Sequence, residues 1–132
     1  MSVSQNRDLS PSLARIGPEP QKLGAPKCPV PAHLAPAKIR ALADAVHQGL
    51  VETCGVPPKD RFQLVSTFAP EMMFIDPTFP DVTRTADASI IEILFLEGRT
   101  IEQKKNLFRR IADRAVSAGF SGDDIMITLT EN

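Results

Sequence analysis

The chain has 132 residues, 42% of them apolar and 23% charged, and its 15 basic and 16 acidic side chains leave a net charge of −1. This length suits one domain with one core, and the balanced charge offers no footprint for nucleic acid or an acidic membrane. No apolar run is long enough to span a bilayer, and the N-terminus lacks the apolar stretch of a secretory signal. The two cysteines, Cys28 and Cys54, are too few for a disulfide framework or a zinc cluster, so we expect a cytoplasmic protein without a metal site.

The first part of the chain differs from the rest, because seven of the 12 prolines lie within the first 36 residues. Residues 1–23 are polar and lack periodicity. Such a segment buries too little apolar surface to offset the entropy lost on ordering. We therefore expect a disordered N-terminal extension over residues 1–23 and one folded domain over residues 24–132.

An amphipathic helix is predicted over residues 36–54, where apolar side chains recur at spacings of three and four. Pro36 lies in its first turn, and Gly55 is placed to end it. The alternation that follows predicts a strand over residues 62–68. Residues 72–75 are a candidate for a short strand within a connection rich in proline and aspartate.

Residues 89–96 are almost all apolar and many are β-branched, which predicts a central strand. Thr100 and Gln103 have the spacing of a capping box, which opens a second amphipathic helix. Gly119 is placed to end this helix, and the alternation after it predicts a last strand over residues 125–129.

The two halves of the chain are similar at a spacing of 64 residues. Gly55 and Gly119 each end a predicted helix, and Asp60 and Asp124 each follow five residues later at the entrance to a strand. Similarity at a fixed spacing indicates one supersecondary unit used twice. The unit is strand, helix, strand, with a right-handed crossover between parallel strands.

The repeat places two β-α-β units at about residues 24–68 and 88–131, and this requires a first strand near residues 24–31. Prolines in that stretch lack the N–H group that donates to a neighbouring strand, so a central strand is not expected there. We expect either an edge strand or a departure from the fold. The prolines concerned are Pro26, Pro29 and Pro31.

Several motifs, taken together and in order, resemble the tautomerase superfamily. They are most similar to its malonate semialdehyde decarboxylase and cis-3-chloroacrylic acid dehalogenase branches, and they cover about residues 32–132. The resemblance implies an α/β (α+β) fold in which tandem β-α-β units form a four-stranded sheet with two helices on one face, and it implies a homotrimer. The motifs are Gly55-Val-Pro-Pro-Lys-Asp-Arg-Phe-Gln63, Asp76-Pro-Thr-Phe79, Glu97-Gly-Arg-Thr-Ile-Glu-Gln-Lys104, Asp123-Asp-Ile-Met-Ile127 and Thr130-Glu-Asn132.

The resemblance also implies site residues and chemistry that needs no cofactor. Arg99 matches the shared arginine that holds a substrate carboxylate, for which a guanidinium fork is suited. Asp60 matches the aspartate that assists in the decarboxylase branch. A second arginine of the family is absent, since its positions hold Glu97 or Leu96.

The family's catalytic base is the amine of an N-terminal proline, which falls by position at Gly24. The nearest prolines, Pro26 and Pro29, are internal, and an internal proline nitrogen is a tertiary amide without a basic lone pair. Pro26 is therefore a catalytic candidate only if processing exposes its amine. A further alternative is that the natural chain starts at a proline near position 24 and continues past Asn132.

Two histidines are weaker candidates for the site. His47 follows Val46 of the apolar helix stripe, so it is either a partly buried helix residue or an acid or base. His33 precedes the first helix, and we expect it to face the place where the family's active site opens.

Two classes of function stay open at this point. One is a tautomerase-superfamily enzyme that performs keto–enol tautomerisation, decarboxylation or hydration on a small oxo-carboxylate. The other is a trimeric family member that binds small carboxylates without proline chemistry. In both cases the expected partners are a small carboxylate and further copies of the chain, not nucleic acid or a membrane.

Overall fold

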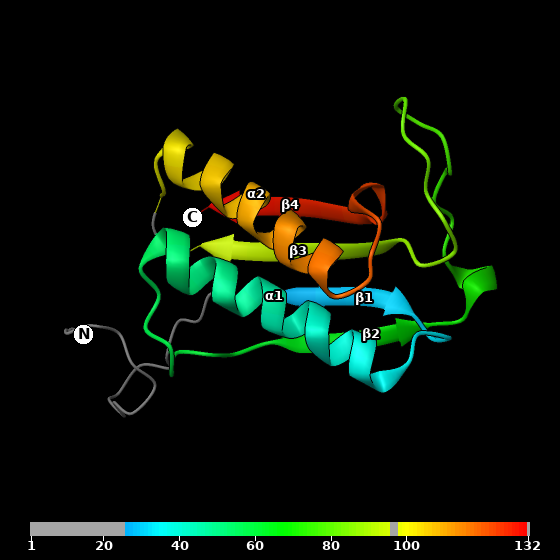
Figure 1. Ribbon diagram of the computed structural model, residues 1–132, viewed down its shortest axis with the longest axis horizontal. Coiled ribbons are helices and arrows are strands. Elements are labelled where there is room, and N and C mark those ends of the chain that lie inside the picture. The colour runs from blue at the N-terminus through cyan, green and yellow to red at the C-terminus, as the bar shows by residue number, and fades with distance from the viewer. Residues whose placement is uncertain (1–25, 96–97, 132) are drawn as a thin grey trace.

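The computed structural model describes residues 26–95 and 98–131. The expected extension over residues 1–23 and positions 24, 96 and 97 lie outside the described residues. Short 3-10 turns, η1 and η2, precede β3 and β4 (Figure 1). The elements are β1 (Lys27–Pro31), α1 (Pro36–Cys54), β2 (Leu64–Phe68), η1 (Pro70–Met72), β3 (Ser89–Phe95), α2 (Ile101–Ser117), η2 (Gly122–Asp124) and β4 (Ile125–Glu131).

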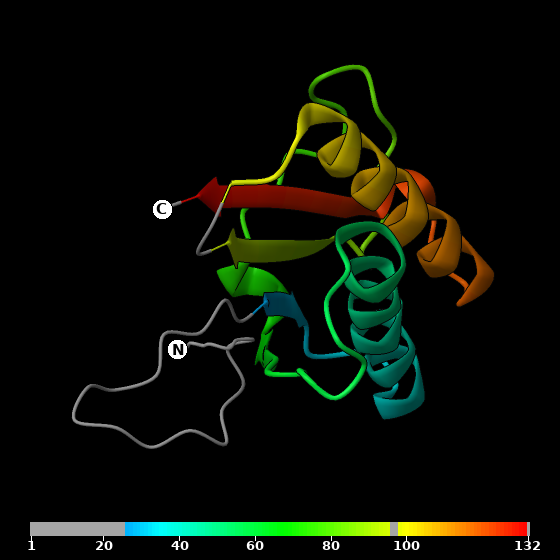
Figure 2. The same ribbon diagram turned by 90° about the vertical axis from the view of Figure 1, so that its left-hand side faces the viewer.

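The strands form one four-stranded sheet in the order β2-β1-β3-β4. β1 pairs with β2 and β3 pairs with β4 in parallel, while the two central strands β1 and β3 run antiparallel. Each parallel pair is joined through one helix, and both helices lie on the same face of the sheet (Figure 2). The expected fold, two β-α-β units in one sheet with two helices on one face, is confirmed.

The core lies between the helices and the covered face of the sheet. Leu42 and Val46 of α1 and Leu107 and Ile111 of α2 are almost fully buried. The two helices approach closely at Gly49, where an added Cβ would lie 2.8 Å from the Ile111 side chain. Close packing of this kind explains why a glycine, a poor helix former, occupies the middle of α1.

The helix ends agree with the sequence signals. The Thr100 side chain accepts from the Gln103 N–H and the Gln103 side chain accepts from the Thr100 N–H, so the predicted capping box is present. Gly55 and Gly119 both have positive φ, 70° and 99°, a conformation that costs glycine little.

β1 is a central strand, so the expectation of an edge strand was wrong. Backbone groups of successive strand residues point alternately to the two neighbouring strands. β2 bonds to the even-numbered residues, because Leu64 N–H donates to the Pro26 carbonyl (3.1 Å) and Ala32 N–H donates to the Phe68 carbonyl (2.8 Å).

The nitrogens of Pro29 and Pro31 therefore face β3, not β2. Five residues of β1 pair with β2, whereas the pairing with β3 is limited, among the described residues, to Lys27 with Glu92. Pro29 and Pro31 are tolerated in a central strand because neither removes a hydrogen bond between β1 and β2.

The predicted short strand over residues 72–75 is also wrong. Pro70 instead opens η1, in which Met72 N–H donates to the Ala69 carbonyl (2.9 Å) and Met73 N–H donates to the Pro70 carbonyl (3.2 Å). Proline at the start of a helical turn loses no hydrogen bond, and its φ already suits the turn. No helix in the described part of the chain is long and apolar enough to cross a membrane.

Candidate active site

Three of the site residues predicted from the sequence lie at one end of the sheet. The first residues of β1 and β2, the last residues of β3 and β4, the end of α1 and the start of α2 all lie at this end, on the left in Figure 1. Topology requires this, because each crossover helix runs back along the sheet before the next parallel strand starts. Pro26, Asp60 and Arg99 belong to these ends.

The turn that carries Asp60 is fastened to α1. The buried His47 side chain donates from Nε2 to the Pro58 carbonyl at 2.8 Å. Beyond the turn, Arg61 donates to Asp44 of α1 at 2.8 Å, and Gln63 donates to the Ala43 carbonyl at 2.8 Å. The turn is therefore held to the helix on both sides of Asp60.

Burial raises the pKa of Asp60 above its ordinary value, and the nearby His47 lowers it by a smaller amount. Among the residues that the structure describes, none donates a hydrogen bond to the Asp60 carboxylate. A half-buried carboxyl group without such donors holds its proton to higher pH than an exposed aspartate. A carboxyl group whose pKa is raised by burial is a candidate for proton transfer.

Arg99 lies in the connection from β3 to α2, immediately before the helix cap. Its guanidinium carbon lies 4.7 Å from the centre of the Phe95 ring, and its backbone N–H donates to Glu131 Oε2 at 2.9 Å. The other oxygen of Glu131 accepts from Lys104 Nζ at 2.6 Å. These contacts hold the pKa of Glu131 below its usual range, with Lys104 contributing most.

Pro26 is buried directly before β1, and its carbonyl accepts from the Leu64 N–H. In the sequence it follows Ala25, so its nitrogen belongs to a peptide bond. The family's proline position, Gly24, lies outside the described residues. Pro26 nevertheless lies at the same end of the sheet as Asp60 and Arg99.

His33 lies at the opposite end of the sheet, so the expectation that it faces the site was wrong. It follows β1, and its Nε2 contacts Asp87 Oδ1 at 2.8 Å just before β3 begins. Lys38 donates to the other oxygen of Asp87 at 2.9 Å. His47, by contrast, lies in α1 beneath the Asp60 turn and holds it in place.

Sequence reasoning missed the part played by Glu131 and Lys104. Lys104 belongs to a basic helix face that is usually solvated, and Glu131 carries no chemical signature of its own. The available signal was topological: the parallel pairing of β3 and β4 sets Glu131 opposite Phe95, where the chain leaves the sheet toward Arg99.

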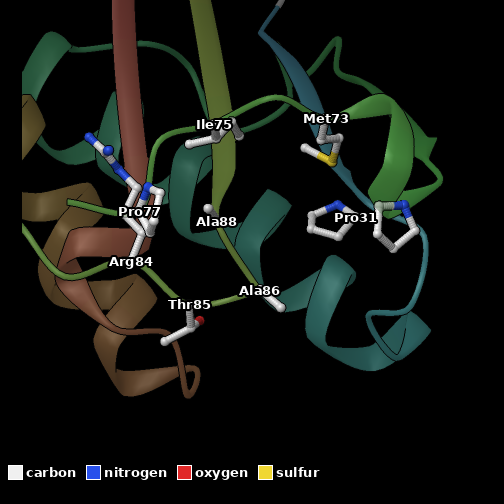
Figure 3. Close-up of a pocket in the computed structure, with 9 residues that line it drawn as sticks. Pro31, Met73, Ile75, Pro77, Arg84, Thr85, Ala86 and Ala88 are labelled. Carbon is white, nitrogen blue, oxygen red and sulfur yellow. The ribbon is translucent and has the colours of Figure 1, made fainter. Parts of the chain in front are cut away.

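A hollow lies at the far end of the sheet from Asp60 and Arg99, where β1 ends (Figure 3). Its lining is mainly proline, alanine and other apolar side chains, with Arg84 and Thr85 as polar members. Both are engaged in loop structure, because Arg84 donates to the Asp76 and Phe79 carbonyls and Thr85 donates to Asp124. No group of three or more His, Cys, Asp or Glu side chains in the described part of the chain could hold a metal ion.

Comparison with known proteins identifies the family. A family model described as tautomerase enzyme matches residues 60–132, which include Asp60, Arg99 and Glu131. The chain belongs to the tautomerase family. A probable tautomerase of Bacillus subtilis (strain 168), YusQ, is 35% identical over 95 residues, 71% of this chain and 75% of the relative. A second one, YrdN, is 28% identical over 97 residues, 73% of this chain and 74% of the relative.

Solved tautomerase-fold structures agree with this membership. A malonate semialdehyde decarboxylase inhibited by 3-bromopropiolate is 31% identical, with a TM-score of 0.77 over 82% of each chain. A second malonate semialdehyde decarboxylase, described with decarboxylase and hydratase activities, is 28% identical, with a TM-score of 0.76 over 82% of this chain and 84% of that one. The fused 4-OT trimer, at 17% identity and a TM-score of 0.67 over 82% of this chain and 85% of that one, shares the fold.

Proposed function

We propose that this tautomerase-family chain is an enzyme that performs cofactor-independent acid–base chemistry on a small oxo-carboxylate. The reactions in view are keto–enol tautomerisation and decarboxylation or hydration. One observation carries the proposal: a half-buried aspartate with a raised pKa and an arginine lie at the same end of the sheet. Relatives described as tautomerases and as malonate semialdehyde decarboxylases support it.

Arg99 binds the substrate carboxylate in this proposal. Its guanidinium carbon lies 4.7 Å from the centre of the Phe95 ring, and a guanidinium fork is suited to bind a carboxylate through two parallel hydrogen bonds. Asp60 moves or orients a proton. Ketonisation of an enol takes a proton from oxygen and adds one to the neighbouring carbon, so it consumes no other reactant and needs groups that accept and donate protons.

A proline amine supplies the base only if processing exposes it. Cleavage before Pro26 frees a secondary amine at the end of the sheet that carries Arg99 and Asp60. Burial of Pro26 favours the neutral amine, because a desolvated ammonium is costly. Pro29 is the poorer candidate, since it lies inside β1.

The second candidate function is carboxylate binding without turnover by a trimeric family member. The position of Pro26 within the sequence favours it, because an amide nitrogen cannot act as the base. The two functions share Arg99 and differ in whether a basic nitrogen exists.

We also propose a homotrimer in a reducing, cytoplasmic setting. The sheet face opposite the helices carries exposed apolar side chains, among them Leu64 and Phe68 at 65% and 41% exposure. Apolar surface of this kind on one face is typical of an interface, and the fused 4-OT neighbour is a trimer. The buried free thiols of Cys28 and Cys54 suit a reducing compartment.

The deciding experiment combines intact mass with a binding and turnover assay. Purified protein is weighed, then tested for ketonisation of phenylpyruvate enol and for binding of phenylpyruvate. We expect Arg99→Ala to weaken binding about tenfold or more, because a charge-assisted hydrogen bond pair is lost. Arg109→Ala is the matched control, since Arg109 is an exposed arginine of α2.

Each result separates the alternatives. Turnover with a chain that begins at Pro26 supports the proline mechanism, and turnover at family-like rates with residues 1–25 intact contradicts it. Saturable binding without turnover supports the second function. Equal binding by Arg99→Ala and Arg109→Ala contradicts both functions, because each assigns the carboxylate to Arg99.

A further inference from the structure

Glu131 is the last residue of β4 and lies opposite Phe95 in the parallel register of β3 and β4. Residues paired in this way share one face of the sheet, and Phe95 points to the face that the helices cover. The Glu131 carboxylate therefore lies under the segment that leaves β3 and opens α2. This is the segment that carries Arg99.

Each carboxylate oxygen of Glu131 accepts a hydrogen bond from a residue near the start of α2. Oε2 accepts from the Arg99 backbone N–H at 2.9 Å, and Oε1 accepts from Lys104 Nζ in the first turn of α2 at 2.6 Å. The capping box satisfies the next N–H groups, those of Thr100 and Gln103. Glu131 thus adds a third side-chain acceptor at the start of the helix, where a negative charge is also favoured by the helix dipole.

Arg99 is consequently held at two points. Its side chain packs on Phe95 at 4.7 Å, and its backbone is tied to Glu131. A guanidinium that must meet a carboxylate in a fixed geometry needs its backbone fixed too, because a loop that shifts by about 1 Å loses much of the benefit of orientation.

We propose that Glu131 is a positioning residue for Arg99: its hydrogen bond to the Arg99 backbone N–H fixes the backbone there, so that the Arg99 guanidinium meets the substrate carboxylate in a set geometry. The inference rests on the proposed function and adds to it a residue from β4. Lys104 acts with Glu131, because it holds the other carboxylate oxygen. Glu131 does not touch the substrate, so its loss affects binding through Arg99 alone.

The first arm of the test measures whether Glu131 orders Arg99. Amide hydrogen exchange of Arg99 is followed by NMR in the wild type, Glu131→Ala and Glu131→Gln. We expect exchange at least about tenfold faster in Glu131→Ala, because the acceptor of this N–H is gone, and a smaller change in Glu131→Gln, which keeps one acceptor oxygen. The control variant is Glu102→Ala, because Glu102 is an exposed glutamate in the first turn of α2.

The second arm measures phenylpyruvate binding and the ketonisation constants of the same variants. We expect the dissociation constant and KM to rise about three- to tenfold in Glu131→Ala, with kcat changed less, since uniform binding energy is lost. Lys104→Met should give a smaller rise. Thermal unfolding is recorded in parallel, because a merely structural role would lower Tm and leave the dissociation constant unchanged.

The outcomes separate this inference from the function on which it rests. If Arg99→Ala weakens binding but Glu131→Ala binds like Glu102→Ala, the positioning role is overturned and the function stands. Unchanged protection of the Arg99 amide in Glu131→Ala overturns the positioning role whatever the binding data show. If Arg99→Ala itself binds normally, the proposed function fails, and Glu131 is then a structural residue only.

Discussion

Asp60 and Asp124 occupy equivalent places in the two repeated units, but their carboxylates lie in different surroundings. Asp124 is 1% exposed, and its carboxylate accepts from the Thr85 N–H at 2.7 Å and from the Thr85 hydroxyl at 2.5 Å. Asp60 is half-buried, and burial rather than hydrogen bonding dominates its pKa. The connection between β2 and β3 crosses the entrance to β4 and supplies Thr85, whereas the entrance to β2 packs against α1.

This difference shows that equivalent residues of a repeated unit can serve a structural role in one copy and a chemical role in the other. A buried carboxylate with its hydrogen bonds satisfied stabilises the loop that it joins. A carboxyl group that is partly desolvated without donors destabilises its own charged form, and that property is useful for moving protons. The second unit uses its aspartate to hold a loop, and we assign the first unit's aspartate to the reaction.

The largest expected effect comes from Asp60→Asn, which tests the chemical half of the comparison. Because an amide cannot take up or release a proton here, we expect kcat for ketonisation to fall about 10²- to 10⁴-fold. Phenylpyruvate binding should change little, since it depends on Arg99. The measurement is steady-state kinetics beside a binding titration, and a rate within about twofold of the wild type would sink the assignment.

The pH dependence of the stability of Asp60→Asn tests whether burial raises the pKa of Asp60. Because burial raises the folded pKa of Asp60 above the unfolded value, the folded state loses stability as the pH rises from the unfolded pKa through the folded one. Asparagine does not ionise and escapes this loss. We expect the free energy of unfolding of Asp60→Asn, relative to the wild type, to increase as the pH rises from the unfolded pKa of aspartate through the folded one, in urea titrations over a pH series.

Asp124→Ala tests the structural half and should give the next largest effect. It leaves the backbone N–H and the hydroxyl of Thr85 without their part-buried acceptor, which costs about 1–3 kcal/mol of the free energy of unfolding. Asp124→Asn keeps one acceptor oxygen and should lose less. Urea unfolding measures both, and a loss below about 0.5 kcal/mol in Asp124→Ala would contradict the assignment.

His47→Leu alters the surroundings of Asp60 without touching its carboxyl group. The Pro58 carbonyl loses its donor, which costs about 1 kcal/mol of stability. Because His47 lowers the pKa of Asp60, its removal should move the acidic limb of the kcat/KM profile to higher pH. The control is Gln48→Leu on the exposed side of α1, and identical pH profiles for the two variants would count against coupling between His47 and Asp60.

The smallest expected effect is at Asp87, which lies in the connection between β2 and β3 that Asp124 holds through Thr85. Its N–H donates to the Thr85 hydroxyl, and hydrogen bonds from His33 and then Lys38 hold its pKa below the usual range. The stability that these hydrogen bonds add to the folded state is fully present above the unfolded pKa of Asp87, and it is lost as the pH falls through the folded pKa. Asp87→Asn should cost about 1 kcal/mol or less at neutral pH, because the pair is partly exposed, and added salt should shrink the difference.

Much of this arrangement could be predicted from the sequence. The capping box of Thr100 and Gln103 and the helix-ending Gly55 and Gly119 depend on neighbours within a few residues, so local pattern reveals them. The resemblance to tautomerases supplied Asp60 and Arg99 as site candidates, and the topology places both at one end of the sheet.

The rest could not be predicted, because it depends on which distant segments meet. β1 can be a central strand because the nitrogens of Pro29 and Pro31 point away from β2. Their direction is set by the register in which β1 pairs with β2. The expected place of His33 failed for a similar reason, since the strand direction carries it away from Arg99. Glu131 reaches Arg99 only because β4 lies beside β3.

The sequence by itself determined the periodicity of the helices and strands, their ends, and the repeat that fixes two β-α-β units. These properties are local, or they recur at a fixed spacing, so a single chain displays them. Only the tertiary structure decided how the two equivalent aspartates differ. The solvation and hydrogen bonding of a carboxylate are set by the segments packed around it. Thr85 donates hydrogen bonds to Asp124, whereas Asp60 lies beside α1 and its His47.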